Sequence, residues 1–281
     1  MKRMISNPEY FEELKNKIKS QGYDNLHVLA DFDRTLTYGS IGGKKTPSII
    51  SLLRDGNHLA EGYAEKAHAL FDKYHPIEID LNLPIEEKKE KMMEWWDSHN
   101  QLLVDSGLKK LDIKDIVMQG HLKFREGALE FFDFLYEKKI PLVIISASGA
   151  GEAIPMFFEK YKRNYSNIIY VINRFEWDNE GNFKGRIRPT IHSLNKDETI
   201  LKDFPVIYEK IENRKNVILL GDGLGDLGMI EGFDYDNLMK IGFLNFQEDE
   251  LREAYKQSFD VVLEGDGDFN FVNELFRDLE K

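Results

Sequence analysis

The chain has 281 residues, of which 42% are hydrophobic and 31% charged, the balance of a globular protein in water. Its formal net charge of −12 argues against a nucleic-acid-binding protein, because such proteins present a basic surface. It has no cysteine, which excludes disulfides, thiolate catalysis and cysteine-ligated zinc. No segment approaches 18 consecutive apolar residues and no signal-peptide run is present, so we expect no membrane span and a cytoplasmic location.

Helices and buried strands alternate along the chain. The pair Asn7-Pro8 predicts the start of a first helix, and helical patterns recur at residues 126–139 and 248–257. Short runs rich in Val, Ile and Leu predict buried strands at residues 27–32, 141–146, 167–173, 216–221, 240–245 and 259–263. This alternation predicts an α/β fold, a Rossmann-like doubly wound parallel sheet with helices on both faces.

Two insertions interrupt this order. More than a hundred residues separate the first strand from the second, and residues 45–125 have helical patterns, so we predict an inserted helical cap domain. The catalytic core would then comprise residues 1–44 and 126–281. A second, smaller insertion in residues 174–189 has aromatic ends around Asn179-Glu180-Gly181-Asn182, which predicts a β-hairpin.

Polar side chains follow the predicted strands where each strand ends. In open α/β sheets ligands bind at the carboxyl ends of the strands, so these residues are the candidates for chemistry. Two carboxylates set two residues apart, Asp31 and Asp33, would repel each other unless a metal, a substrate or a solvated loop relieves this repulsion. The remaining candidates are Ser146 after the second strand, Lys196, and the two acids Asp222 and Asp226.

This combination predicts phosphoryl transfer. Carboxylate oxygens suit Mg²⁺, and a magnesium ion between Asp31 and Asp222 would cancel the repulsion between Asp31 and Asp33. Ser146 and the N–H groups after it would hold phosphate oxygens, with Lys196 supplying further positive charge. Asp31 would attack phosphorus and form an aspartyl-phosphate, while Asp33 would protonate the leaving oxygen and then deprotonate water.

The motifs "DFDRTLT", "IISAS", "NK" and "LLGDGLGDL", in this order, resemble the four motifs of the haloacid dehalogenase superfamily. Longer stretches, among them "YHPIEID", "EEKKEKMMEWWDSHNQLLV" and "ILLGDGLGDLGMIEG", resemble the pyrimidine 5′-nucleotidase family, that of cytosolic 5′-nucleotidase III. The resemblance runs from about residue 20 to the end of the chain. It implies a magnesium-dependent phosphatase of nucleoside 5′-monophosphates.

The resemblance also implies roles for individual residues. Asp31 matches the nucleophile and Asp33 the acid/base, and both match metal ligands together with Asp222. Asp226 matches a supporting acid. Three residues match the phosphate clamp: Ser146, Ala147 and Lys196. In the cap, Glu78 matches the acid that recognises the base.

Two further cap positions concern the choice of base. Trp95 and Trp96 are adjacent, and adjacent helical residues point about 100° apart, so we expect one of them to line the cleft and stack on the base. A double tryptophan here resembles the branch acting on 7-methylguanosine monophosphate, whose base is cationic, and we assign the stacking to Trp96. A gapless match puts His99 at a substrate contact, whereas a shift of one residue puts Ser98 there.

These observations predict a hydrolase acting on pyrimidine nucleotides such as CMP and UMP, or on 7-methyl-GMP. Two alternatives stay open at this point: a phosphatase of other small phosphomonoesters with the same core, and a nucleotide-binding protein without catalysis. The complete set of Asp31, Asp33, Lys196 and Asp222 argues against the second alternative. The sequence does not indicate the oligomeric state.

Overall fold

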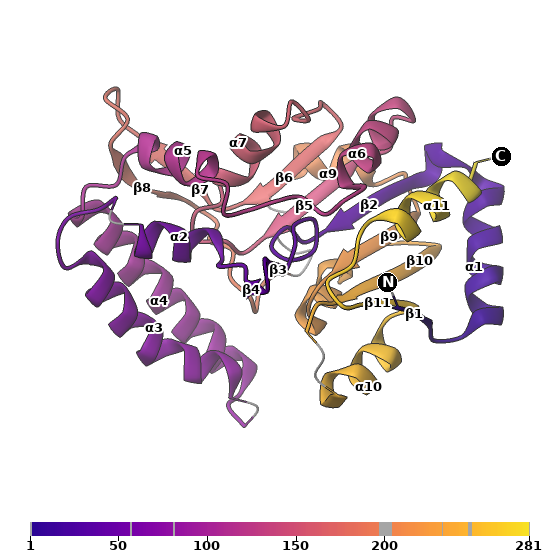
Figure 1. The fold of residues 1–281 in the computed structure, drawn as a ribbon, viewed down its shortest axis with the longest axis horizontal. Helices are drawn as coiled ribbons and strands as arrows, with labels where there is room; N and C mark the ends of the chain where they lie inside the picture. The colour runs from indigo at the N-terminus through magenta and orange to yellow at the C-terminus, as the bar shows by residue number, and fades with distance from the viewer. Residues whose placement is uncertain are drawn as a thin grey trace.

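The structure is a computed structural model that describes residues 2–56, 58–80, 82–196, 204–231, 233–246 and 249–280, without the side chains of residues 249 and 250. A seven-stranded sheet forms its centre, in the order β1-β11-β10-β9-β2-β5-β6 (Figure 1). The strands are β1 (Lys2–Ile5), β2 (Leu26–Ala30), β5 (Leu142–Ser146), β6 (Ile168–Ile172), β9 (Asn216–Gly221), β10 (Asn237–Leu244) and β11 (Val261–Glu264). All neighbours pair in parallel except β1, which runs antiparallel to β11 at one edge.

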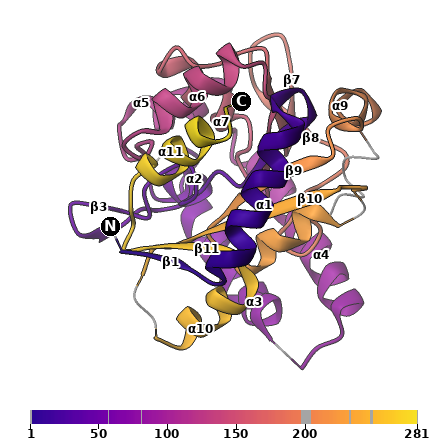
Figure 2. The ribbon, with the colours of Figure 1, turned by 90° about the vertical axis from the view of Figure 1, so that its right-hand side faces the viewer.

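Helices cover both faces of this sheet because alternate strand residues point to opposite sides. Val28 and Ile144 belong to one apolar cluster, whereas their neighbours Leu29 and Val143 belong to another. The first cluster is covered by α1 (Pro8–Gln21), α6 (Ala128–Glu137), α7 (Ala153–Lys160) and α11 (Asn270–Asp278), and α1 and α11 lie on this same side (Figure 2). The second is covered by α9 (Pro205–Ile211), α10 (Asp249–Ser258) and the 3₁₀ segment η2 (Leu224–Ile230).

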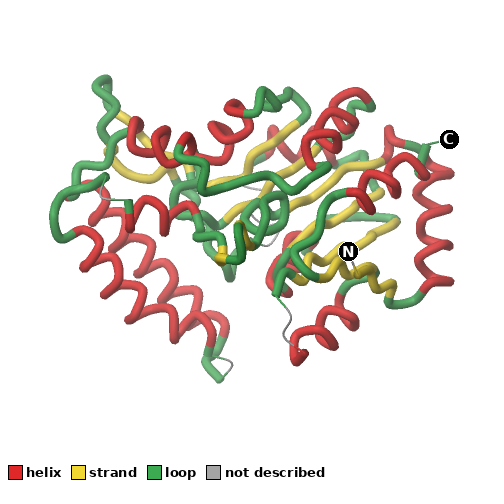
Figure 3. The backbone as a smooth tube through the Cα atoms, in the orientation of Figure 1, coloured by secondary structure: helices red, strands yellow, loops and turns green. Residues whose placement is uncertain are grey.

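Five helices of the described chain lie between β2 and β5: α6, which covers the sheet, and before it α2 (Ile49–Asp55), α3 (Tyr63–Ile79), α4 (Ile85–Asp105) and α5 (Lys110–Met118). The long helices α3 and α4 pack side by side and stand away from the sheet, while the strands gather in the core (Figure 3). In contrast, α5 packs on α7 of the core, and the Lys160 ammonium donates to the Val117 carbonyl at 2.7 Å. The division into a core and a cap at residues 45 and 125 stays a prediction.

The predicted strands and helices are present within a few residues of their expected bounds. Asn7 caps α1, its side chain accepting from the Tyr10 N–H at 3.1 Å. The predicted hairpin consists of β7 (Arg174–Trp177) and β8 (Phe183–Ile187). The prediction missed β1, a short edge strand whose sequence KRMI has only two apolar residues, and the two-residue strands β3 (Ser40–Ile41) and β4 (Lys44–Lys45). Residue 248, the first of one predicted helix, lies outside the described residues.

Within the part of the chain that the structure describes, no helix is both long and apolar enough to cross a membrane.

Candidate active site

The first predicted acid follows directly after β2, near the middle of the sheet. Asp31 is only 5% exposed, and its carboxylate accepts from the Lys196 ammonium and, at 3.3 Å, from the Thr35 hydroxyl. Because β2 ends at Ala30, Asp31 and Asp33 lie on a loop rather than on a strand. The positive charge of Lys196, in contact with Asp31, reduces the repulsion between these two carboxylates.

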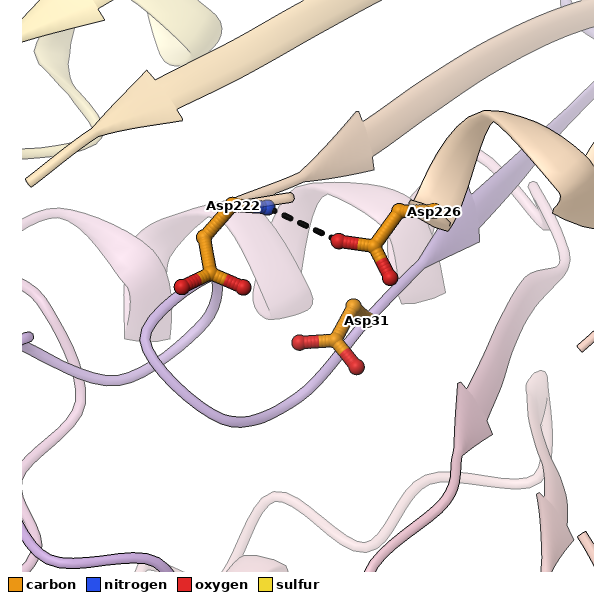
Figure 4. A group of neighbouring side chains, drawn as sticks. All are labelled: Asp31, Asp222 and Asp226. Atoms are coloured by element: carbon orange, nitrogen blue, oxygen red, sulfur yellow. Dashed lines mark hydrogen bonds between the residues drawn. The ribbon is translucent and has the colours of Figure 1, made fainter. Parts of the chain in front are cut away.

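Three carboxylates from two segments converge beside this loop. Asp31, Asp222 and Asp226 each offer an oxygen within 4.8 Å of the others (Figure 4). Asp226 is engaged on both oxygens: one accepts from Lys196 at 3.0 Å, and the other from the N–H groups of Asp222 and Gly223 at 3.0 Å each. The Asp222 carboxylate accepts only a long bond, 3.4 Å, from Asn245 among the described contacts.

This arrangement fits a magnesium ion. The donors are hard carboxylate oxygens, which Mg²⁺ prefers. Asp226 accepts three hydrogen bonds, whereas Asp31 accepts two and Asp222 accepts one long one, so Asp31 and Asp222 have more lone pairs left for a metal. The expected contribution of Asp33 to the metal is not among the described contacts and stays a prediction.

Burial governs the electrostatics of these groups. It raises the pKa of Asp31 to about 7, opposed by Lys196 and reinforced by Asp226 and Asp33. Burial also raises the pKa of Asp33 to about 6, with Arg34 and Lys196 opposing it, and it raises the pKa of Asp222. Burial alone would lower the pKa of Lys196, but Asp226 and Asp31 outweigh it and raise that pKa, so the ammonium stays charged. A cation beside Asp31 and Asp222 would favour their ionised forms.

The strand β5 brings the predicted phosphate clamp to the same edge of the sheet as Asp31. Ser146 ends β5 and is buried, and its hydroxyl accepts from the Ser148 N–H at 3.1 Å. Ala147 and Gly149 line the same cavity as Asp31 and Lys196. The following helix, α7, begins only at Ala153, so the loop after Ser146 is longer than a direct strand-to-helix turn.

Sequence reasoning missed Arg125, the largest fully buried side chain in the described chain at 1% exposure. Its guanidinium donates to the backbone carbonyls of Arg34, Thr35 (2.8 Å) and Gly267 (2.6 Å) and to the side chains of Asn245 (2.6 Å) and Asp266 (3.0 Å). Asp266 in turn accepts from the N–H groups of Gly39 and Ser40, both at 2.7 Å. Arg125 thereby ties the loop after Asp31 to two later segments of the core.

The loop needs such support because Arg34 adopts a left-handed conformation, with φ 62°. A side chain in this region costs of order 1–3 kcal/mol and persists only where the surroundings hold it. The Arg34 carbonyl accepts from Arg125 and from Asn245 (3.0 Å), and its N–H donates to the Thr37 hydroxyl at 2.9 Å. No local pattern reveals this role, because Arg125 lies outside every motif and the predicted division assigned it to the end of the cap.

On the cap side, Glu78 lies in the last turn of α3. It lines the cavity that Asp31, Lys196 and Asp222 also line, which is the reaction cavity. Its carboxylate accepts from the Ser193 hydroxyl, three residues before Lys196, and pairs with His75 Nδ1 at 2.9 Å. Glu78 therefore joins the cap to the core segment that carries Lys196.

Trp95 and Trp96 both line the reaction cavity, contrary to the expectation that only one would. Their rings are nearly parallel, 15° apart, with centroids 6.1 Å from each other, and Trp95 also stacks on Tyr74 at 5.9 Å. The guanidinium of Arg186, from β8, lies 4.6 Å from the Trp96 ring centroid. Trp96 therefore contacts a cation through its ring and lies parallel to Trp95.

His99 is buried and does not line the reaction cavity. Its Nε2 lies 3.0 Å from the Tyr63 hydroxyl and its Nδ1 lies 3.4 Å from Arg186 Nη2. Because a guanidinium only donates, Nδ1 must accept, so the ring carries its hydrogen on Nε2 and donates to Tyr63. Ser98, the alternative substrate contact, is exposed and does not line the reaction cavity. The predicted substrate contact at His99 stays untested.

The reaction cavity encloses about 310 Å³, at the small end of the range for ligand sites. Its charged lining comprises four acids, Asp31, Asp33, Glu78 and Asp222, and two cations, Arg34 and Lys196. The residues predicted to bind phosphate line it on the core side, and the two tryptophans, Met92 and Glu78 line it on the cap side. A ligand with a phosphate at one end and a flat group at the other matches this division.

The family model of the pyrimidine 5′-nucleotidases (UMPH-1) matches residues 34–280. The chain belongs to this family. A 7-methylguanosine phosphate-specific 5′-nucleotidase of Mus musculus is 35% identical over 275 residues, covering 98% of this chain and 91% of that protein. The corresponding protein of Gallus gallus is also 35% identical, covering 97% and 94%. The crystal structure of cytosolic 5′-nucleotidase IIIB bound to cytidine superposes with a TM-score of 0.87 at 27% identity, over 99% of this chain and 93% of that one.

These comparisons confirm the predicted family and the predicted α/β fold of the superfamily. They also confirm, at the level of the family, the prediction that the chain is a 5′-nucleotidase. They do not test which of its residues perform the individual roles.

Proposed function

We propose that this chain is a magnesium-dependent 5′-nucleotidase that releases phosphate from nucleoside 5′-monophosphates, with 7-methyl-GMP as its preferred substrate. The observation that carries the proposal is the single cavity that joins the Asp31–Lys196–Asp222 cluster to Glu78 and the two tryptophans. Family membership and the names of the most similar relatives support it. The cytoplasmic location stays a prediction.

The chemistry proceeds in two displacements. The Asp31 carboxylate attacks phosphorus, the bond to the nucleoside 5′-oxygen breaks, and Asp33 gives that oxygen its proton. Asp33 then takes a proton from water, whose oxygen attacks the aspartyl-phosphate and restores Asp31 while phosphate leaves. A pKa of about 6 suits Asp33 to both roles near neutral pH.

Charge on the phosphate is balanced by Lys196 and by the N–H groups after Ser146. Asp31 and Asp222 would hold the magnesium ion, which when bound neutralises charge on the phosphoryl oxygens. Asp226 positions Lys196 and the start of the Asp222 segment through the three hydrogen bonds that its carboxylate accepts, so it acts through these groups rather than on the substrate.

The cap end favours a cationic base. Glu78 supplies a carboxylate beside the tryptophans, and four acids against two cations give the cavity a negative lining. A 7-methylguanine carries a positive charge, which stacking on Trp96 and pairing with Glu78 would both stabilise. CMP and UMP lack this charge and would depend on stacking alone.

The test is phosphate release from CMP, UMP, AMP, GMP, 7-methyl-GMP and two sugar phosphates, each with Mg²⁺ and with EDTA. We expect metal-dependent release, fastest from 7-methyl-GMP. Preference for CMP and UMP would keep the nucleotidase and overturn the choice of base. Release from the sugar phosphates alone would favour the phosphatase of other phosphomonoesters. Release from no compound would favour a binding protein.

A further inference from the structure

The strand β8 of the hairpin packs against α4, the cap helix that carries both tryptophans of the reaction cavity. The Arg186 N–H donates to the Asn100 side chain at 2.9 Å, and the Arg188 guanidinium pairs with Asp97 at 2.8 Å. Asp97 and Asn100 are three residues apart, so they lie on the same side of α4. The hairpin therefore holds one side of this helix.

The Arg186 guanidinium lies between α4 and the loop after Ser146. Its Nη1 donates to the Trp96 carbonyl at 3.1 Å, and its central carbon lies 4.6 Å from the centroid of the Trp96 ring. Its Nη2 donates to the Gly149 carbonyl at 3.4 Å and lies equally far from His99 Nδ1. One side chain thus contacts the ring predicted to stack on the base and the loop predicted to bind phosphate.

This loop and the Trp96 ring also touch each other directly. A Cβ on Gly149 would lie 3.0 Å from Trp96 Cζ3 and 3.1 Å from Ile50 Cγ1, closer than side chains normally pack. Glycine is used where a backbone must approach a neighbour this closely. Gly149 and Trp96 both line the reaction cavity, so its phosphate side and its base side meet at this contact.

No carboxylate of the described residues forms an ion pair with Arg186, although a charge removed from water is normally paired with one. Asp97 pairs with Arg188 instead. Nε of Arg186 is buried and has no hydrogen-bond partner in the described part of the chain. The charge is compensated by the Trp96 ring and by two carbonyls, which ties the guanidinium to the positions of these groups.

We propose that Arg186 is a positioning residue that fixes the Trp96 ring relative to the phosphate-binding loop at Gly149. It acts through these two residues, because it is not among the described residues that line the reaction cavity. A substrate with a base and a phosphate needs both sides of the cavity at one separation, whereas a phosphomonoester without a base needs only the phosphate side. Arg186 thereby favours nucleoside monophosphates over smaller phosphomonoesters. The inference rests on the proposed nucleotidase function, but not on the choice of base.

The experiment uses the full chain in Mg²⁺ with two ligands. One is the nucleoside monophosphate that the wild-type chain hydrolyses fastest, and the other is inorganic phosphate, an inhibitor without a base. Arg186→Met keeps a long side chain but removes the charge and the donors. We expect the KM for the nucleotide to rise about tenfold with kcat much less affected, because stacking of the base is weakened. The inhibition constant of phosphate should stay unchanged.

Arg188→Met is the matched control. It removes a charge from the same hairpin and a contact to the same helix, but both partners of this ion pair are more than half exposed. It should therefore change the KM by less than about threefold. Arg186→Lys should recover part of the nucleotide KM, because an ammonium can stay over the ring but lacks the planar fork that reaches both carbonyls.

Equal weakening of nucleotide and phosphate by Arg186→Met would overturn the proposal, because it would show a general loss of structure. An unchanged nucleotide KM in this variant, or an equal rise in Arg188→Met, would also overturn it. Failure of the proposed function is seen in the wild-type chain itself, as the absence of metal-dependent phosphate release from every nucleotide, and it would remove this inference as well.

Discussion

Two cavities meet at Trp95 and Trp96: the reaction cavity, and a second cavity of about 550 Å³ inside the cap that Arg34, Lys45 and Arg54 line. They differ in charge and in the elements that form their walls. The reaction cavity has four acids and lies where β2, β5 and β9 end. The second cavity has three cations and is built mainly from cap helices and the loop before them. The same pair of rings thus separates a negative compartment from a positive one, so charge can sort ligands that share a shape.

The difference extends to protonation. Burial raises the pKa of Asp33 to about 6, so acidification stabilises the folded chain at the reaction cavity. Burial, with Arg186 and Arg54, lowers the pKa of His99 to about 3, so acidification destabilises the folded chain at the second cavity. The two compartments therefore respond to pH with opposite signs.

The largest effect should come from the nucleophile. Asp31→Asn removes the attacking oxygen, and we expect phosphate release to fall by at least about 10⁴-fold. The variant should stay folded, because Asn has nearly the same shape as Asp. Initial rates and a thermal unfolding curve check both points. Substantial residual turnover would remove Asp31 from the proposed mechanism.

Arg125→Met tests how rigidly Arg34, which lines both cavities, is held. It leaves Asp266 and three backbone carbonyls without their buried donor, so we expect unfolding to require about 3–5 kcal/mol less. Urea unfolding measures this, and kcat should fall as the loop after Asp31 loosens.

The matched control is Arg163→Met. Arg163 pairs with Asp133 at 2.6 Å, but both side chains are partly exposed, so its loss should cost about 1 kcal/mol or less. Equal losses in the two variants would show that Arg125 is no special support of the loop.

The sequence predicts the residues of the reaction cavity better than those of the second cavity. Asp31, Asp222 and Lys196 follow from strand ends and family motifs, because chemistry dictates their types and spacing. Arg125 and Arg54 do not, since each acts on segments that only folding brings near it. The strand β1 was missed for a related reason: its pairing with β11 joins the two ends of the chain, and KRMI alone has no clear alternation.

A smaller effect should come from protonation of His99, which lowers the stability of the folded chain as the pH falls. The pKa of His99 is about 3 when folded and 6.5 unfolded, so between these values the unfolded chain binds more protons. The stability that neutral His99 contributes is complete above pH 6.5 and is lost as the pH falls toward 3. At pH 5 the loss amounts to about 2 kcal/mol.

His99→Gln keeps a donor and an acceptor but does not titrate, so it isolates this loss. Between pH 7 and pH 5, urea unfolding should show the wild-type chain losing about 2 kcal/mol more than the variant. His121→Gln, at an exposed histidine, should follow the wild type. Parallel pH profiles for the His99 variant and the wild type would contradict the buried, neutral state of His99.

The smallest effect concerns selection by charge in the reaction cavity. Glu78→Gln keeps the shape and the bond to Ser193 but removes one negative charge beside the tryptophans. We expect the KM for 7-methyl-GMP to rise about tenfold, with kcat and the KM for CMP nearly unchanged, because only the cationic base loses an interaction. Glu94→Gln, on the exposed side of the same cap, controls for a general loss of negative charge. If both substrates weakened equally, Glu78 would position the cap against the segment carrying Lys196, and the sorting of bases would fall to Trp96 alone.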